Sequence, residues 1–315
     1  MSGHADSGSP AFGEILVVTD AAPTSANALW RGALIAREHG ASMRVLHDAG
    51  ESASAVQAQQ AIDKVGRQVQ ERLGIDIHAQ VLDGELLAKA IAAAHSARLL
   101  VTGPRRASRF REWMSGTHAE RLMRLNRVPT LVVRRPAMPG RNAALDGAGE
   151  PGRYGRVLVS VDLLPEAPDV ISAAMAFSRD PQMQVLYALS AQAYRKLSPP
   201  EGLDAGGFTA MQRAQHALRD YVSANAAASS GVVPMVAFGH AADTVLSRER
   251  AIGAELVVIG ARTRGLLANL FGREATRKVL ANSTADVLVV PDVREPGFEP
   301  VRTISSEPTA LLPGR

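Results

Sequence analysis

The chain contains no cysteine, which excludes disulfide bonds, cysteine nucleophiles and metal or iron–sulfur sites built on thiolates. Aromatic residues make up only 4% of the sequence, so the apolar residues available for a core are mainly Ala, Val and Leu. This composition is typical of helices packed on a buried sheet of β-branched strands.

Long apolar runs are also absent. Stretches such as 256–259 and 287–290 are far shorter than the roughly 20 residues that a membrane helix needs. Residues 1–12 lack the basic start and apolar segment of a secretory signal. We therefore expect a cytoplasmic protein that does not associate with membranes.

Lysine is scarce among the 35 basic residues, and it occurs only as Lys64, Lys89, Lys196 and Lys278. The net charge of +4 is modest for 315 residues. Such a preference for Arg more often reflects genome composition than a binding surface, so an Arg-mediated nucleic-acid binder is the least favoured functional hypothesis.

The sequence does contain an internal repeat. Three strand-like segments recur in the same order: 14–20 and 156–162, 97–103 and 254–260, and 129–133 and 286–290. Asp162 lies 142 residues after Asp20, whereas Gly260 lies 157 residues after Gly103. The second copy therefore has 15 additional residues, and its stretch 190–207, which contains Pro and Gly, is predicted to be an inserted loop.

Strands alternate with helices in both copies. In the first copy, strands are predicted at 14–19, 42–47, 75–82, 98–102 and 129–134, with helices at 24–39, 52–73, 85–96 and from about 117. In the second copy, strands are predicted at 156–161, 183–189, 232–238, 255–259 and 286–290. This α/β alternation predicts two tandem Rossmann-like domains, each a five-stranded parallel sheet with helices on both faces.

Composition predicts the domain boundaries. The expected parts are a disordered N-terminus (1–12), a first domain (13–135), a linker without periodicity (136–155), a second domain (156–292) and a flexible tail (293–315).

Ligands of an open parallel sheet collect beyond the carboxyl ends of its strands. In the first copy, Asp20 ends the first strand and Gly103 ends the fourth. A predicted helix starts near Gly116, where free amide groups suit phosphate oxygens. The candidate ligand-binding residues of this copy are Asp20, Gly103, Arg106, Gly116, Thr117 and His118.

These motifs resemble those of the universal stress protein (UspA-type) family. Its nucleotide-binding members carry Gly, two residues, a second Gly, nine residues and then Gly-Ser or Gly-Thr after the fourth strand. The first copy matches at Gly103, Gly116 and Thr117. It departs at Arg106, which stands in place of the second Gly. The resemblance extends over both copies and implies the adenine nucleotide alpha hydrolase-like variant of the fold.

The second copy follows the family pattern less closely. Its candidate residues are Asp162, Gly260, Thr263 and Gly272. Thr263 replaces the second Gly, and in ungapped register Arg273 and Glu274 stand where Gly-Ser belongs. A carboxylate there would repel a phosphate at the helix start. A one-residue bulge that brings Gly272 to the phosphates remains open.

Each candidate also has a purely structural interpretation. Asp20 and Asp162 can cap the turn after a strand, and the glycines can serve turns that need a positive φ. Thr117 can be a helix N-cap. Arg106 is explained equally well as a solvated surface residue, and His118 is better explained as a solvated helix residue than as a general acid or base.

The resemblance implies a non-catalytic stress-response protein that binds ATP or a related adenine nucleotide in the first copy, with Mg²⁺ only as a companion of the nucleotide. The sequence lacks a Walker-type phosphate loop, a nucleophile elbow and a His-Glu-x-x-His helix. We therefore expect no enzyme, apart from a slow incidental ATPase. The alternative is a nucleotide-free protein-interaction module of the same fold.

An unidentified regulatory protein is the expected partner. The resemblance also implies that the fifth strands, at 130–133 and 287–290, pair with each other as an intramolecular pseudo-dimer. A further homodimer is left open.

Overall fold

The computed structural model describes residues 13–20, 25–48, 55–82, 86–94, 96–103, 128–137, 152–163, 170–179, 183–198, 209–226, 231–261 and 273–291. In the first half the elements are β1 (Glu14–Asp20), α1 (Ser25–His39), β2 (Ser42–Asp48), α2 (Ala55–Leu73), β3 (Ile77–Leu82), α3 (Leu86–Ala94), β4 (Leu99–Thr102) and β5 (Thr130–Val132). In the second half they are β6 (Val157–Val161), α6 (Val170–Phe177), β7 (Met183–Leu189), α7 (Ala191–Leu197), α8 (Ala210–Asn225), β8 (Val233–Phe238), α9 (Ala241–Ile252), β9 (Leu256–Ala261), α10 (Arg273–Asn282) and β10 (Asp286–Pro291).

The strands form one continuous ten-stranded sheet with the order β3-β2-β1-β4-β5-β10-β9-β6-β7-β8. Within each half all pairs are parallel. The halves join where β5 pairs antiparallel with β10, with Val132 opposite Val287. The predicted α/β fold class, with five parallel strands in each copy, is confirmed, and every predicted strand lies within two residues of an observed one.

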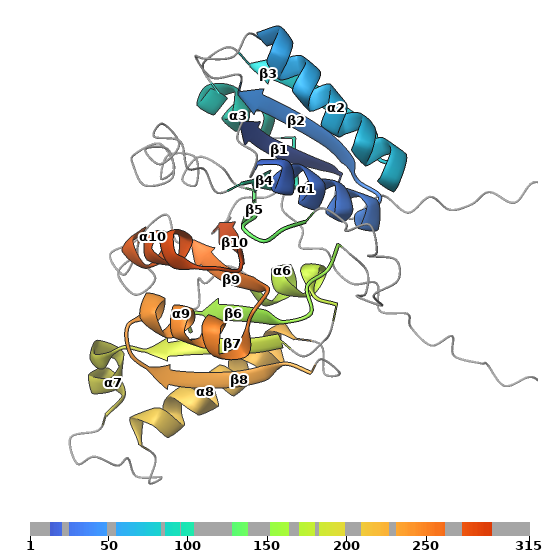
Figure 1. Ribbon diagram of the computed structural model, residues 1–315. Helices are drawn as coiled ribbons and strands as arrows, with labels where there is room; N and C mark the ends of the chain where they lie inside the picture. Colours follow the sequence, from blue (N-terminus) through green and yellow to red (C-terminus); the bar gives the residue numbers. More distant parts are fainter. Residues whose placement is uncertain are drawn as a thin grey trace, which may run out of the picture.

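Helices cover both faces of the sheet (Figure 1). On one face, α1 and α6 bury side chains against strands of both halves in a single hydrophobic cluster that includes Trp30 and Phe177. On the other face, α3 packs over the first half and α9 and α10 pack over the second half, in two separate clusters. The core of one face therefore runs through the junction between the halves.

Local sequence explains several element ends. The hydroxyl of Thr209 accepts from the backbone N–H of Gln212, and the Gln212 side chain accepts from the Thr209 N–H, which closes a capping box at the start of α8. Helix α9 ends at Gly253, which adopts the left-handed conformation (φ 60°) that glycine tolerates best. Pro234, which lacks an N–H, lies in the edge strand β8.

The prediction of a loop at 190–207 is wrong for its first part, because residues Ala191–Leu197 form helix α7. Ser190 caps this helix by accepting from the N–H of Ala193. No side chain of α7 is buried, so the apolar periodicity that reveals most helices is missing here. Residues 199–208 lie outside the described part of the chain.

The stretch 136–155 is described only at its two ends. Both ends are packed: Ala137 is buried, and Tyr154 is buried and forms a bridge with Ser178 of the second half. We call residues 133–137 and 152–156 the connecting segments. The predicted disordered N-terminus and flexible tail lie outside the described residues. Among the helices that the structure describes, none has the length and apolar character needed to cross a membrane.

Candidate functional site

Each half has a switch point at which the order of its strands reverses. In the first half the chain moves from β1 outward to β2 and β3 and then returns to β4 on the other side of β1; β6 and β9 flank the same point in the second half. The carboxyl ends of these strands form the edge at which such sheets bind ligands. Because β5 and β10 are antiparallel, the two carboxyl edges point in opposite directions.

The first-half edge brings together two of the predicted residues. Asp20 ends β1, and buried Gly103 directly follows β4, the neighbouring strand. Asp48 ends β2 in register with Asp20. One residue before the two acids, a buried hydrogen bond of 2.9 Å joins Thr19 Oγ1 to His47 Nδ1. The edge therefore combines acidic strand ends with a polar pair that fixes the last positions of β1 and β2.

The remaining first-copy candidates, Arg106, Gly116, Thr117 and His118, lie outside the described residues, as do Thr263 and Gly272 of the second copy.

The second-half edge contains Asp162, half-buried directly after β6, and Gly260, half-buried within β9. Tyr187 of β7 lies beside Asp162: burial raises the pKa of the Tyr187 phenol, and the negative charge of Asp162 raises it further. Helix α10 begins at Arg273 and has exposed Glu274 in its first turn. A negative charge in this turn favours the helix but opposes an anion placed at its start.

Sequence reasoning missed His47 and Tyr187. Strand pairing places His47 opposite Thr19 and Tyr187 opposite Val161, at the same point of the repeat. The signal was present, because Met43-Arg-Val-Leu-His47 aligns with Met183-Gln-Val-Leu-Tyr187. The two edges therefore differ: one has a Thr–His pair where the other has Val and Tyr.

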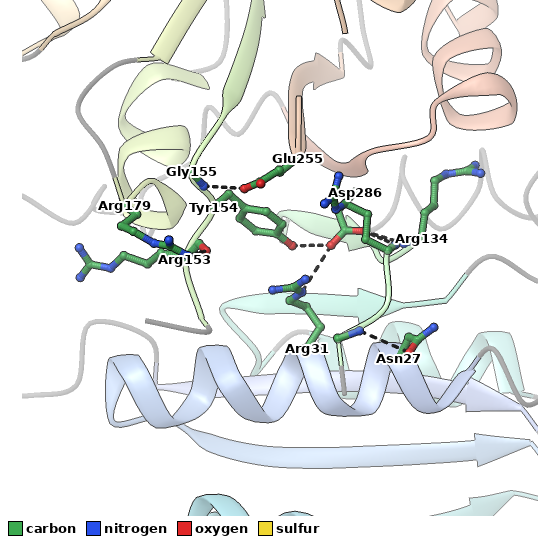
Figure 2. Close-up of polar contacts among 11 residues, drawn as sticks. Asn27, Arg31, Arg134, Arg153, Tyr154, Gly155, Arg179, Glu255 and Asp286 are labelled. Atoms are coloured by element: carbon green, nitrogen blue, oxygen red, sulfur yellow. Dashed lines mark hydrogen bonds and ion pairs between the residues drawn. The ribbon is translucent and has the colours of Figure 1, made fainter. Parts of the chain in front are cut away.

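A buried polar cluster lies where the two halves meet (Figure 2). Its centre is Asp286, the first residue of β10, whose side chain is fully buried. The Tyr154 hydroxyl donates to Asp286 Oδ2 at 2.7 Å, and Arg31 of α1 approaches the same oxygen at 3.4 Å. The Arg31 guanidinium also lies over the Tyr154 ring, 4.7 Å from its centroid. Burial, followed by the charge of Asp286, raises the pKa of Tyr154 well above its ordinary value.

The other oxygen of Asp286 holds a connecting segment. The backbone N–H groups of Arg134 and Arg135 donate to Oδ1 at 2.7 and 2.8 Å. The Arg134 side chain extends onto the second half and donates to the carbonyl of Leu280 near the end of α10. Burial lowers the pKa of Arg134, while the charges of Glu249 and Asp286 raise it.

The polar cluster adjoins the first-half edge. Arg134 comes two residues after β5, and the intervening Val133 donates its N–H to Thr102 of β4 at 2.8 Å. Gly103 follows β4, and the residues bonded to Asp286 follow the neighbouring strand β5. Within the described residues no group of His, Asp and Glu side chains is arranged to hold a metal ion.

These features define a class of protein with two doubly wound α/β halves in tandem. Each half has a carboxyl edge of the type at which such sheets bind ligands. A model of the universal stress protein family matches residues 11–134 and again residues 153–291. The chain therefore belongs to the universal stress protein family, as its motifs had indicated.

Solved structures with the same fold include other chains of similar length. A structure described as a putative universal stress protein from Pseudomonas aeruginosa UCBPP-PA14 is 17% identical, with 90% of this chain and 94% of that chain covered and a TM-score of 0.60. A universal stress protein from Archaeoglobus fulgidus DSM 4304 is also 17% identical, with 89% and 96% covered and a TM-score of 0.59. No protein among the curated sequences compared matches the chain.

Proposed function

We propose that this chain is a cytoplasmic, non-catalytic stress-response regulator that binds ATP or a related adenine nucleotide at the first-half edge, with Mg²⁺ entering only as part of the nucleotide complex. The observation that carries the proposal is the placement of Asp20 and Gly103 at the ends of neighbouring strands at a switch point. Membership of the universal stress protein family supports it. A glycine at the end of β4 leaves room for a ligand to approach the backbone.

The second-half edge is the weaker candidate. Glu274 places a carboxylate in the first turn of α10, close to where a phosphate would meet the helix start. Tyr187 and Asp162 give this edge a different chemistry from the Thr19–His47 pair. If both edges are empty in the isolated protein, the chain is better described as a nucleotide-free interaction module that contacts a regulatory protein.

The proposal is tested on the full-length chain by isothermal titration with MgATP and by chromatography of nucleotides released on denaturation. The repeat supplies a matched pair of variants, Asp20→Ala and Asp162→Ala. Loss of a hydrogen bond to a charged group at the binding edge weakens affinity by about tenfold or more. We expect that loss in Asp20→Ala and a small effect in Asp162→Ala. The reverse pattern would assign binding to the second half, and absence of ATP binding and of released nucleotide would refute the proposal.

A further inference from the structure

One face of α1 contacts the connecting segments along the whole length of the helix. The residues of this face are Asn27, Arg31, Leu34 and Glu38, spaced at the three- and four-residue intervals of a single helical stripe. The Asn27 side chain accepts from the N–H of Ala137 at 3.4 Å, and Glu38 pairs with Arg153. Between these points Arg31 reaches Asp286. Helix α1 therefore contacts both connecting segments and, through Arg31, the second half, in addition to the pairing of β5 with β10.

Close approach at the last turn of α1 requires a glycine. A Cβ atom on Gly152 would lie 2.9 Å from the carbonyl oxygen of Leu34, nearer than such atoms normally come. The second connecting segment therefore lies directly against the end of α1.

His39, the last residue of α1, contacts the residue of the second half to which this connecting segment is hydrogen-bonded. Its ring lies edge-on to Phe177, the last residue of α6, with 6.3 Å between ring centroids and an interplanar angle of 63°. The Phe177 carbonyl accepts from the N–H of Tyr154 at 2.8 Å, and the Tyr154 carbonyl accepts from the N–H of Arg179 at 2.9 Å. An imidazole from the first half thus packs on the residue that anchors Tyr154. We call this contact the His39 junction.

The charge that acts on the His39 ring is that of Arg153 on the connecting segment. Glu38 pairs with Arg153 and offsets part of this charge. The carbonyl of Arg153 in turn accepts from the Arg179 guanidinium at 3.4 Å. Burial, and then the charge of Arg153, lower the pKa of His39.

We propose that the His39 junction is a pH-sensitive contact between the halves, closed when the imidazole is neutral and opened when it takes up a proton. An opened junction exposes His39 and returns it to the ordinary pKa of about 6.5. The closed state therefore binds fewer protons than the open state, and its advantage is lost as pH falls below about 6.5. The proposal is independent of any nucleotide, because none of these residues belongs to the carboxyl edges.

The first measurement is an NMR titration of the histidine rings in the full-length chain. We expect the midpoint of His39 to lie below the ordinary histidine value of about 6.5. The variant Arg153→Gln removes the neighbouring charge and should raise the His39 midpoint. A His39 midpoint at or above about 6.5 would overturn the proposal.

The second measurement is amide hydrogen exchange between pH 7.5 and 5.5, corrected for intrinsic rates. The reporters are the N–H groups of Tyr154 and Arg179. In the wild type their opening equilibrium should rise as pH falls, by up to about tenfold over this range. His39→Gln should remove this rise, and the matched variant His78→Gln should keep it. Unchanged pH dependence in His39→Gln would contradict the proposal.

Discussion

The carboxylate of Asp286 sits between the two halves and serves both. It accepts hydrogen bonds from the Tyr154 hydroxyl and from two backbone N–H groups of a connecting segment, and it forms an ion pair with Arg31. A buried carboxylate is stable only because these donors replace the water it has lost. Removing it would also affect the donors, because the Tyr154 hydroxyl is buried and Arg134 and Arg135 are half-buried.

Replacement of this carboxylate should therefore be costly. In Asp286→Ala the Tyr154 hydroxyl and the N–H groups of Arg134 and Arg135 lose their acceptor, and we expect the free energy of unfolding to fall by about 3–5 kcal/mol. Urea denaturation measures this change. Tyr154→Phe is the control, because it removes a single donor and should cost about 1 kcal/mol. Equal effects of the two variants would show that Asp286 does not hold the connecting segment.

Single residues were the least predictable level from sequence. Asp20 and Gly103 were identified because their positions depend only on where a strand ends. The Thr19–His47 hydrogen bond depends on the register between two strands, which the sequence does not state. Asp286 looked like an ordinary first residue of a strand. The one clue was that the corresponding position of the first copy is Pro129, so the repeat is not symmetric there.

Among the elements, β5 and β10 determine how the halves are joined. Val133 donates its N–H to β4, and successive N–H groups of a strand alternate in direction. The N–H of Val132 therefore points to β10, opposite Val287.

Val132→Pro removes this donor and should lower the free energy of unfolding by about 3 kcal/mol or more. Val132→Ala keeps the donor and loses only side-chain packing, so it is the matched control. Thermal melts and sedimentation velocity of both variants test the pairing. If the two variants have the same melting temperature, the backbone hydrogen bond of Val132 does not stabilise the pairing of β5 with β10.

Most elements were predictable because their apolar spacing follows from burial. The inner strands of both copies are largely buried and rich in Val, Leu and Ile, whereas the edge strands β3 and β8 are only partly buried. Helix α7 was not predicted because it buries no side chain. It is held instead by its Ser190 cap and by a hydrogen bond of 2.7 Å from Arg213 to the carbonyl of Leu197, and neither contact leaves a periodic pattern.

At the scale of the whole molecule, we expect the chain to unfold as one unit. One hydrophobic cluster includes residues from both halves, and the sheet is continuous through them. The sequence provides separate probes, because both Trp residues (Trp30 and Trp113) lie in the first copy and all four Tyr residues lie after position 153.

Urea curves followed by Trp emission and by Tyr absorbance should therefore coincide in the wild type. In Val132→Pro the two curves should separate, which serves as the positive control for independent unfolding. Two separated transitions in the wild type would mean that the halves are independent in spite of the shared sheet.

The antiparallel pairing of β5 and β10 also determines whether one binding partner can contact both carboxyl edges. A strand of six residues is about 20 Å long, so the acids Asp20 and Asp162 belong to opposite poles of the sheet. Molecules docked at the two poles would not touch each other, and no single flat surface could cover both. A protein that contacted both poles would have to wrap around the sheet. Two copies of a smaller protein could instead each bind one pole, and this chain would then link them.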